Sequence, residues 1–270
     1  MSKTIFITGS TDGIGLATAR KLIGEGHKVI LHGRNPAKLA NVQQELISAS
    51  SAAQVDGFVA DLSRLTDVVA LANAVSEKYN QIDVLVNNAG IFKTTEAMTD
   101  GGIDLRFVVN TFAPYLLTQR LLPLLGNTGR VVNLSSAAQA PVDLKALAGD
   151  VRVADDFSAY AQSKLALTMW SQSMAQLLGD QGPVIIAVNP GSLLASKMVK
   201  EGFGVAGNDL SIGADILIRA ALSDEFSTAS GQYFDNDAGQ FSNPHPDVQD
   251  QAKVIGVVAG IESVIKKLSV

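Results

Sequence analysis

Tyr160 and Lys164, in the segment YAQSK, are the residues whose types and spacing best suit proton-transfer chemistry. Residues four apart on a helix share a face, so the phenol and the ammonium would point into the same volume. A free tyrosine has a pKa of roughly 10, and a positive charge within about 4–6 Å favours the phenolate. Lys164 is therefore expected to lower the pKa of Tyr160. Taken alone, the pair is better explained as two amphipathic side chains on a solvated helix face.

Short apolar runs rich in Val and Ile alternate along the chain with longer amphipathic segments. The runs are typical of buried parallel strands and span residues 4–8, 28–32, 57–60, 83–88, 130–136 and 184–190. Helix-length segments lie between them at 13–25, 36–49, 63–79, about 101–125 and 157–179. This alternation predicts an α/β fold: one Rossmann-like domain over residues 1–270, with a doubly wound parallel sheet and helices on both faces. Ligands bind beyond the carboxyl ends of such strands.

A glycine-rich turn, TGSTDGIG at residues 8–15, separates the first expected strand from the first expected helix. Backbone amides and a helix N-terminus attract a pyrophosphate at such a turn, and glycines permit its close approach. Gly9, Gly13 and Gly15 follow the spacing G-x-x-x-G-x-G, which departs from the common G-x-G-x-x-G fingerprint. Without the downstream pair, a tight strand-to-helix connection would explain the turn about as well.

The ordered set of motifs resembles the short-chain dehydrogenase/reductase superfamily over most of the chain. The residues that carry the resemblance are TGSTDGIG, Asp61-Leu62, Asn87-Asn88-Ala89-Gly90, Asn110, Ser135-Ser136, YAQSK from Tyr160 to Lys164, and Pro190-Gly191. Within the superfamily, the HGRN segment, the long stretch between Ser136 and Tyr160, and the YAQSKLA helix start are similar to the retinol-dehydrogenase-like branch.

The resemblance implies an enzyme that interconverts a carbonyl and an alcohol by hydride transfer. Tyr160 would be the general acid in reduction and the general base in oxidation. Lys164 would lower the pKa of Tyr160 and bind the nicotinamide ribose, and Ser136 would hold the substrate oxygen. Asn110 would interrupt the long fourth helix and bind a water that links Lys164 to solvent. Ser135 and Ser136 should face opposite sides of their strand, and the resemblance selects Ser136.

The resemblance also implies a dinucleotide cofactor, with NADP expected over NAD. Gly33 stands where NAD enzymes carry an acidic residue, and Arg34 could pair bidentately with a 2′-phosphate. Asp12 weakens this expectation, because many NADP-preferring relatives carry a basic residue there. Asp61 is expected to contact the adenine, although it also suits a helix start. The full cofactor-binding set is Gly9, Ser10, Thr11, Gly13, Ile14, Gly15, Arg34, Asp61, Leu62, Asn88, Ala89, Gly90, Tyr160, Lys164, Pro190 and Gly191.

The segment after Pro190-Gly191 departs from the family pattern. Relatives carry a threonine that hydrogen-bonds the nicotinamide carboxamide, whereas this chain reads SLLAS, so Ser196 or backbone groups would replace it. Residues 192–212 are predicted to form a substrate lid with an apolar underside, or else a surface loop. With the extra residues 137–157, the lid predicts a covered, apolar pocket for a small carbonyl or alcohol substrate. Apolar residues at helical spacing predict a C-terminal helix over 247–268 that covers the core or meets another subunit.

Composition excludes several functions. A net charge of −5 gives no reason to expect nucleic-acid or membrane-surface binding, and the absence of cysteine excludes disulfides and thiol chemistry. No apolar stretch approaches the roughly 20 residues needed to span a bilayer, and the first strand pattern begins too early for a signal peptide, so a cytoplasmic protein is expected. His27, His32 and His245 lack metal-ligand spacing and are interpreted as turn or surface residues, so no metal site is expected.

Two alternatives compete with the enzyme hypothesis. A catalytically silent dinucleotide-binding sensor or scaffold would have no use for the set Asn110, Ser136, Tyr160 and Lys164. A sugar epimerase of the same fold would need a larger substrate domain than 270 residues provide. The sequence therefore predicts an NADP(H)-dependent oxidoreductase, acting alone or as a homo-oligomer.

Overall fold

The computed structural model describes residues 1–49, 52–195, 204 and 206–268, and its eight strands form one sheet. The strand order is β3-β2-β1-β4-β5-β6-β7-β8, parallel throughout except for β8, which runs antiparallel to β7. The strands are β1 (Thr4–Ile7), β2 (Lys28–Gly33), β3 (Gln54–Val59), β4 (Val84–Asn87), β5 (Arg130–Leu134), β6 (Val184–Asn189), β7 (Tyr233–Asp235) and β8 (Gln240–Ser242). The predicted α/β fold with a doubly wound, mostly parallel sheet is confirmed.

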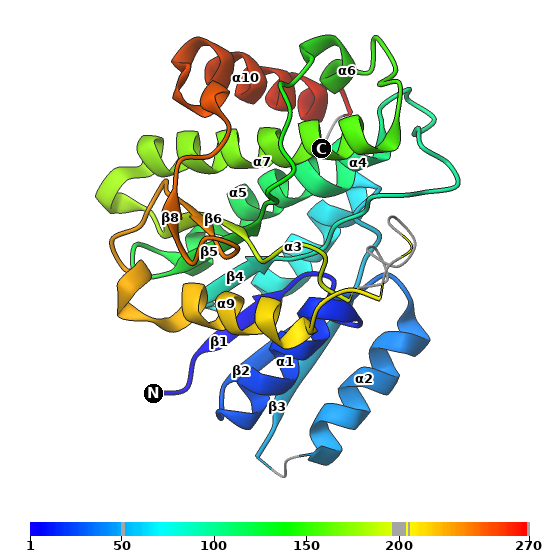
Figure 1. Ribbon diagram of the computed structural model, residues 1–270. Helices are drawn as coiled ribbons and strands as arrows, with labels where there is room; N and C mark the ends of the chain where they lie inside the picture. Colours follow the sequence, from blue (N-terminus) through cyan, green and yellow to red (C-terminus); the bar gives the residue numbers. More distant parts are fainter. Residues whose placement is uncertain (50–51, 196–203, 205, 269–270) are drawn as a thin grey trace.

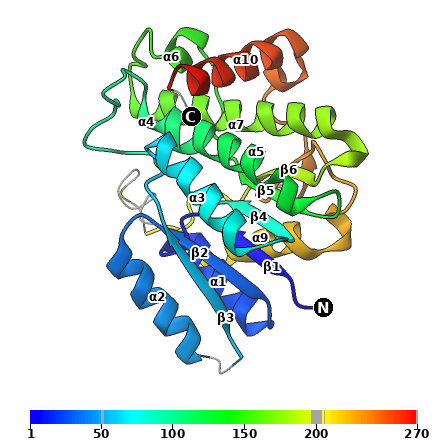
Figure 2. The same ribbon diagram turned by 180° about the vertical axis from the view of Figure 1, so that it is seen from behind.

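Helices cover both faces of the sheet (Figures 1 and 2). One face carries α1 (Gly13–Gly24), α2 (Pro36–Ala49) and α9 (Leu210–Leu222). The other carries α3 (Leu65–Lys78), α5 (Ala113–Leu125) and α7 (Asp156–Leu178), with α10 (Gln251–Lys267) packed over α7 as an outer layer. Shorter elements are α4 (Leu105–Phe107), the π-helical turn η1 (Val108–Phe112), α6 (Leu144–Ala148), and the 3-10 turns η2 (Gly179–Gln181), η3 (Asp224–Phe226) and η4 (Pro246–Gln249).

The central strands are mostly apolar because each buries both of its faces. In β1, Ile5 and Ile7 belong to the core under α1, α2 and α9, whereas Phe6 belongs to the core under α3, α5 and α7. In β4, Leu85 joins the second of these cores and its neighbours Val84 and Val86 join the first. Successive side chains point to opposite faces of a sheet, so two apolar layers require an unbroken apolar run.

Several element boundaries differ from the prediction. β3 begins at Gln54, three residues before the predicted strand, because this edge strand is only half-buried and lacks an apolar run. The predicted helix at 101–125 begins at Leu105 and is interrupted by η1. Helix α9, helix α6 and the β7–β8 hairpin were not predicted, and the last three residues of the predicted lid form the first turn of α9. The rest of the lid includes residues 196–203 and 205, which lie outside the described residues.

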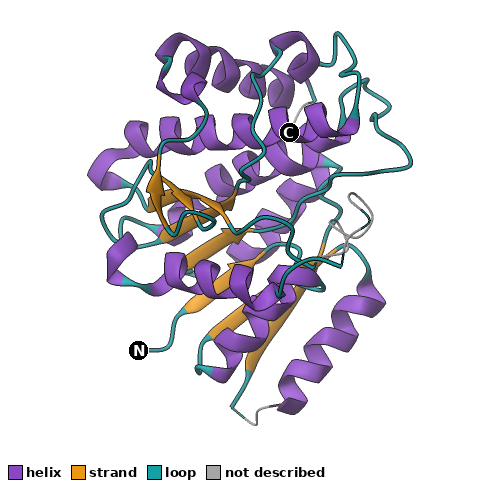
Figure 3. Ribbon diagram, viewed as in Figure 1, coloured by secondary structure: helices purple, strands orange, loops and turns teal. Residues whose placement is uncertain are grey.

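The C-terminal segment folds back onto the molecule (Figure 3). Helix α10 occupies most of the predicted range 247–268, and its Val254, Val257 and Ile261 extend the core of this face outward beyond α7. The buried face of α10 is thus used within the chain, and contact with another subunit stays a prediction. No helix within the described ranges is both long and apolar enough to cross a membrane.

Candidate active site

Tyr160 and Lys164 lie one turn apart near the start of α7, beside the carboxyl end of β5. Lys164 is buried, with 4% of its surface exposed, and its Nζ donates a hydrogen bond to the Leu134 carbonyl oxygen at 2.7 Å. The same Nζ lies 5.6 Å from the centroid of the Tyr160 ring. The end of β5 thus fixes the ammonium directly beside the phenol.

Burial controls the protonation of both groups. It lowers the pKa of Lys164 to about 8, so the ammonium form predominates at neutral pH. It raises the pKa of Tyr160, while a side-chain hydrogen bond with Ser136 acts to lower that pKa. The expectation that the pKa of Tyr160 is depressed is therefore wrong for the protein alone, because desolvation outweighs the other contributions. A protonated phenol is the form required of a proton donor.

The two serines after β5 face different surroundings, as the strand geometry predicted. Ser136 hydrogen-bonds the Tyr160 side chain, and its Oγ accepts from the Ala138 amide at 3.1 Å. Ser135 is buried against α7, where its Oγ lies 2.7 Å from Thr168 Oγ1. Of the two hydroxyls, the structure brings only that of Ser136 to Tyr160.

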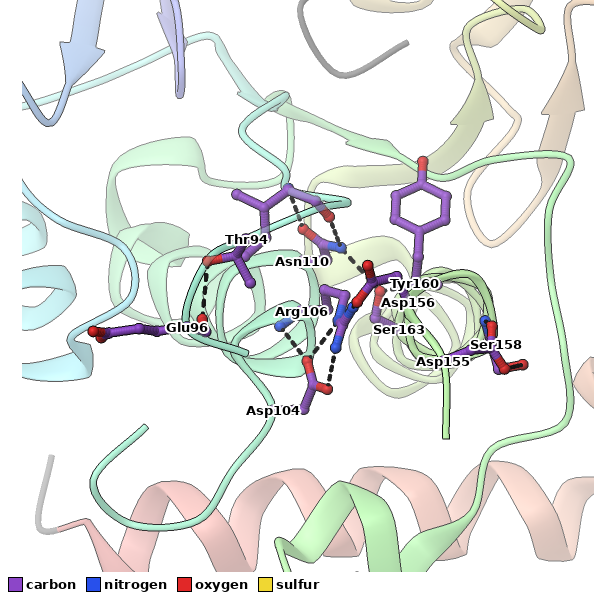
Figure 4. Close-up of polar contacts among 11 residues, drawn as sticks. Thr94, Glu96, Asp104, Arg106, Asn110, Asp155, Asp156, Ser158, Tyr160 and Ser163 are labelled. Atoms are coloured by element: carbon purple, nitrogen blue, oxygen red, sulfur yellow. Dashed lines mark hydrogen bonds and ion pairs between the residues drawn. The ribbon is translucent and has the colours of Figure 1, made fainter. Parts of the chain in front are cut away.

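Asn110 lies at the centre of the π-helical turn η1 and is completely buried. Its Oδ1 accepts from the Ile91 amide at 2.8 Å, and its Nδ2 donates to the Ile91 carbonyl oxygen and to Ser163 Oγ, both at 2.9 Å (Figure 4). The predicted interruption of the fourth helix is present as this π turn. The structure joins Asn110 to α7 through Ser163, and the proposed water link to Lys164 stays a prediction.

The glycine-rich turn and the segment after β4 interlock at the centre of the sheet. Asn88 Nδ2 donates to the carbonyl oxygens of Thr8 at 2.8 Å and Gly9 at 3.1 Å. A side chain at Gly9 would place a Cβ 2.9 Å from Ala89 Cα, and one at Gly15 would lie 2.5 Å from Asn88 Nδ2. Glycines are therefore required here by close backbone approach and, at Gly9, by a φ of 64°.

The same turn brings together further members of the predicted cofactor set. Gly13, with a φ of 55°, begins α1 after its N-cap Asp12, and Ile14 packs against Gly213 of α9. Ala89 and Gly90 border the turn from the end of β4 and are partly exposed. This leaves backbone amides at a helix N-terminus, which is the arrangement that binds phosphate groups.

His32 anchors the turn, a role that sequence reasoning missed. Its Nδ1 accepts from the Gly9 amide at 3.0 Å, and its Nε2 lies 3.1 Å from the Ala60 carbonyl oxygen. Burial lowers the pKa of His32 to about 4, so the ring is neutral. The interpretation as a turn or surface residue is wrong, because an apolar strand carries this side chain into the interior. Ser10 is buried beside it, and its Oγ accepts from the His32 amide at 2.9 Å, so this hydroxyl serves the turn itself.

The region where the adenosine is expected to bind contains the cations Arg34 and Lys38 and the carboxylates Asp12 and Asp61. Gly33 ends β2, and a Cβ there would lie 2.6 Å from Thr11 Cγ2, so Thr11 fills the space of the missing side chain. Burial acts to raise the pKa of Asp61, but the two hydrogen bonds from Ser63 and, to a lesser extent, the charge of the exposed Arg34 hold that pKa below its usual value. Asp61 Oδ1 accepts from both the amide and the hydroxyl of Ser63 at the start of the α3 region.

Lys38 and Leu62 also lie in the region where the adenosine is expected to bind. Lys38 Nζ, on α2, lies 2.6 Å from Asp12 Oδ2 in the glycine-rich turn. Sequence reasoning missed Lys38, because the partners are 26 residues apart. Leu62, another member of the predicted cofactor set, is buried in the core, and its contact with a cofactor stays a prediction.

The segment after β6 is fixed by the β7–β8 corner. Asn236 Nδ2 donates to the Pro190 carbonyl oxygen at 2.9 Å, next to Gly191 with a φ of 120°. Ser192 donates to Asp237 through its amide at 2.8 Å and its hydroxyl at 2.6 Å, so that hydroxyl is already engaged. Ser196, the expected substitute for the usual threonine, lies outside the described residues.

No metal site is formed within the part of the chain that the structure describes: it contains no group of three or more His, Cys, Asp or Glu placed to hold an ion. The predicted catalytic residues and the glycine-rich turn instead converge at the carboxyl ends of β1, β4 and β5. This edge of the sheet is where a doubly wound fold binds its ligand.

Comparisons with known proteins agree with this geometry. A family model described as short chain dehydrogenase matches residues 3–205. Retinol dehydrogenase 13 of Homo sapiens is 28% identical over 269 residues, covering 92% of this chain and 80% of that protein. An uncharacterized protein from Mycobacterium paratuberculosis superposes with a TM-score of 0.80 at 27% identity, covering 98% and 93% of the two chains. A short chain dehydrogenase from Shigella flexneri 2a, solved in complex with NADP, gives a TM-score of 0.68 at 26% identity, covering 87% and 97%.

The matched family model covers well over half of the chain, and relatives named retinol dehydrogenase match most of it. The chain therefore belongs to the short-chain dehydrogenase/reductase family, in its retinol-dehydrogenase-like branch, and is an oxidoreductase of CH–OH or carbonyl groups.

Proposed function

We propose that this protein is an NADP(H)-dependent oxidoreductase that reduces a small, apolar carbonyl compound, with Tyr160 as the proton donor. The observation that carries the proposal is the hydrogen bond between Ser136 and Tyr160 beside the buried ammonium of Lys164. A donor with a raised pKa remains protonated until it is used, which suits a general acid in reduction. The same phenol would act as the base in the reverse reaction.

The residues present fit a nicotinamide dinucleotide. The close approach at Gly9 and Gly15 leaves bare backbone at the N-terminus of α1, where a pyrophosphate would lie. Lys164 would bind the ribose next to the nicotinamide, and the segment at Pro190-Gly191 would border the ring. A bound reduced nicotinamide would supply the hydride. Ser136 would hold the substrate oxygen, and Tyr160 would transfer its hydroxyl proton to that oxygen.

Local charge and space favour NADP over NAD. Thr11 occupies the space beside Gly33, which leaves little room for the ribose-binding acid of NAD enzymes. Arg34 would pair with the 2′-phosphate. Lys38 answers the objection raised by Asp12, because it neutralises that carboxylate. The relative from Shigella flexneri, which was solved with NADP, agrees with this assignment.

The test is NADPH oxidation, followed by the loss of its absorbance, against a panel of aromatic aldehydes, long-chain aldehydes and cyclic ketones. Tyr160→Phe should lower turnover by on the order of 10²- to 10⁴-fold while NADPH binding, measured by fluorescence, is retained. Tyr79→Phe is the matched control, because Tyr79 is also buried but contacts Asp56 of β3. Full activity in Tyr160→Phe would refute the mechanism. NADPH binding without turnover of any compound by the wild-type protein would favour the silent sensor or scaffold.

A further inference from the structure

Arg106 is the most deeply buried charged residue among those described, and the proposed reaction does not use it. Only 2% of its side chain and 3% of that of Asp104 are exposed. Arg106 Nε donates to Asp104 Oδ1 at 2.8 Å and Nη2 donates to Asp104 Oδ2 at 2.6 Å, while Nη1 donates to Asp156 Oδ1. Figure 4 shows the guanidinium between the two carboxylates.

Neither ion pair is an effective means of gaining stability: Asp104 is buried with Arg106, and Asp156 is 45% exposed. Removing charges from water is so unfavourable that well-packed apolar residues usually serve as well or better. The geometry of a planar guanidinium is nevertheless specific, because its fork holds two carboxylates in fixed directions. The location of this cluster is therefore more informative than its contribution to stability.

The cluster joins α4 to the first residue of α7. Asp156 begins α7, and Tyr160 lies four residues later, on the same face of the helix. One turn further, Thr111 Oγ1 donates to the Ser163 carbonyl oxygen at 2.8 Å, next to the bond between Asn110 and Ser163. The α4–η1 segment thus holds α7 on both sides of Tyr160.

The loops in front of α4 and α7 are in close contact as well. A Cβ at Gly149 would lie 3.0 Å from the Gly102 carbonyl oxygen, so the two backbones meet without side chains between them. Phe92, in the loop before α4, packs edge-on against Tyr160 with ring centroids 5.2 Å apart. Arg106 therefore connects the two segments that surround Tyr160, which are the loop before α4 and the loop before α7.

We propose that Arg106 and Asp156 are positioning residues that fix the first turn of α7, so that the Tyr160 hydroxyl stays within reach of Ser136. The ion pair acts on Tyr160 through the helix and touches neither substrate nor cofactor. The catalytic consequence rests on the proposed function, whereas the effect on the position of α7 does not.

Asp156→Asn is the decisive variant, because it removes one charge and leaves the Asp104–Arg106 pair intact. Substitution of Arg106 would leave Asp104 buried and unpaired, and would test folding instead. Asp155→Asn is the matched control: Asp155 is the N-cap of the same helix and accepts from the Ser158 amide at 2.8 Å. Asparagine also caps helices, so this control preserves the cap and removes a carboxylate that senses the Arg106 charge at longer range, which leaves the direct Arg106–Asp156 contact as the difference between the two variants. Asp156→Glu retains a carboxylate that can reach Arg106.

The first measurement, amide hydrogen exchange over residues 157–164, needs no substrate. Asp156→Asn should accelerate exchange by on the order of tenfold relative to Asp155→Asn, since local opening of the first turn becomes easier. Equal exchange in the two variants would overturn the proposal, whatever the enzyme does.

The second measurement is kcat on the best substrate of the carbonyl panel, with the Kd of NADPH measured in parallel. Asp156→Asn should lower kcat by on the order of 10- to 100-fold with the Kd unchanged, and Asp156→Glu should recover most of the loss. An unchanged kcat, or an equal loss in Asp155→Asn, would overturn the catalytic part. Absence of turnover in the wild-type protein would be a failure of the proposed function, and the exchange comparison would still decide the positional claim.

Discussion

At the residue scale, Lys38 alters the charge balance where a 2′-phosphate would bind. Asp12 alone would repel that phosphate, but Lys38 Nζ lies 2.6 Å from the Asp12 carboxylate. The side chains of Lys38 and Asp12 are 47% and 60% exposed to solvent. Such an exposed ion pair contributes at most about 1 kcal/mol to stability, so its loss should not affect folding. Lys38 is therefore suited to mutational tests of cofactor choice.

Lys38→Met should weaken NADPH binding by on the order of tenfold, because it leaves the Asp12 carboxylate uncompensated where the 2′-phosphate would bind, and should change NADH binding much less. Arg34→Ala should act in the same direction. Both are measured as Kd values by nucleotide fluorescence. Lys21→Met is the control, because Lys21 pairs with the Asp215 carboxylate on α9 and should affect neither cofactor. Equal weakening of NADPH and NADH in Lys38→Met would contradict the phosphate assignment.

Functional residues could be predicted from the sequence where their partners are close in the chain, or where several motifs follow one another in the order typical of the family. Tyr160 and Lys164 share a helix face by their spacing alone, and the structure places them together. Arg106 and His32 could not be predicted in this way, because their meaning depends on partners distant in the chain: Asp156 lies 50 residues from Arg106, and Ala60 lies 28 residues from His32.

At the element scale, the glycine-rich turn depends on a neutral histidine in the neighbouring strand. His32 accepts from the Gly9 amide only through an unprotonated Nδ1. Because burial lowers its pKa from 6.5 to about 4, protons bind preferentially to the unfolded chain between these values. The contribution of His32 to stability is therefore complete above pH 6.5 and is lost as the pH falls towards 4.

The unfolding free energy should consequently decrease by up to about 3 kcal/mol through His32 when the pH falls across this range. His32→Gln cannot titrate, so this variant should be less stable at pH 7 and should lose that part of the pH dependence. Urea unfolding at several pH values measures both effects. The assignment would fail if the two proteins showed the same dependence on pH.

Helices and strands could be predicted where a single hydrophobic pattern ran along the whole element. They were missed where a glycine-rich segment or a tertiary contact altered that pattern. The central strands β1, β4, β5 and β6 carry apolar runs because they are buried on both faces, whereas the edge strand β3 lacks such a run and its start was predicted three residues late. Helix α9 follows the glycine-rich segment 202–208, so its first turn was assigned to a lid. The π turn at η1 depends on contacts of Asn110 with Ile91 and Ser163, which no local pattern encodes.

At the scale of the whole molecule, α10 makes one face of the fold three layers deep. The sheet is covered by α7, and α7 is covered in turn by α10, whose buried side chains extend the same core. Tyr115 Oη donates to Glu262 Oε1 at 2.7 Å and adds a polar contact between α5 and α10. The helix that carries Tyr160 and Lys164 is thereby supported from behind.

Ile261→Ala should reduce the unfolding free energy by about 2–5 kcal/mol, because Ile261 is completely buried and its truncation leaves a cavity under α10, on the side that faces α7. Ile255→Ala on the same helix should change it by no more than about 0.5 kcal/mol, since Ile255 is 59% exposed. Both values come from urea unfolding at one pH. Comparable effects of the two substitutions would mean that α10 is not docked in solution. A large difference would show that support for α7 originates at the far end of the chain, about 100 residues after the tyrosine it holds in place.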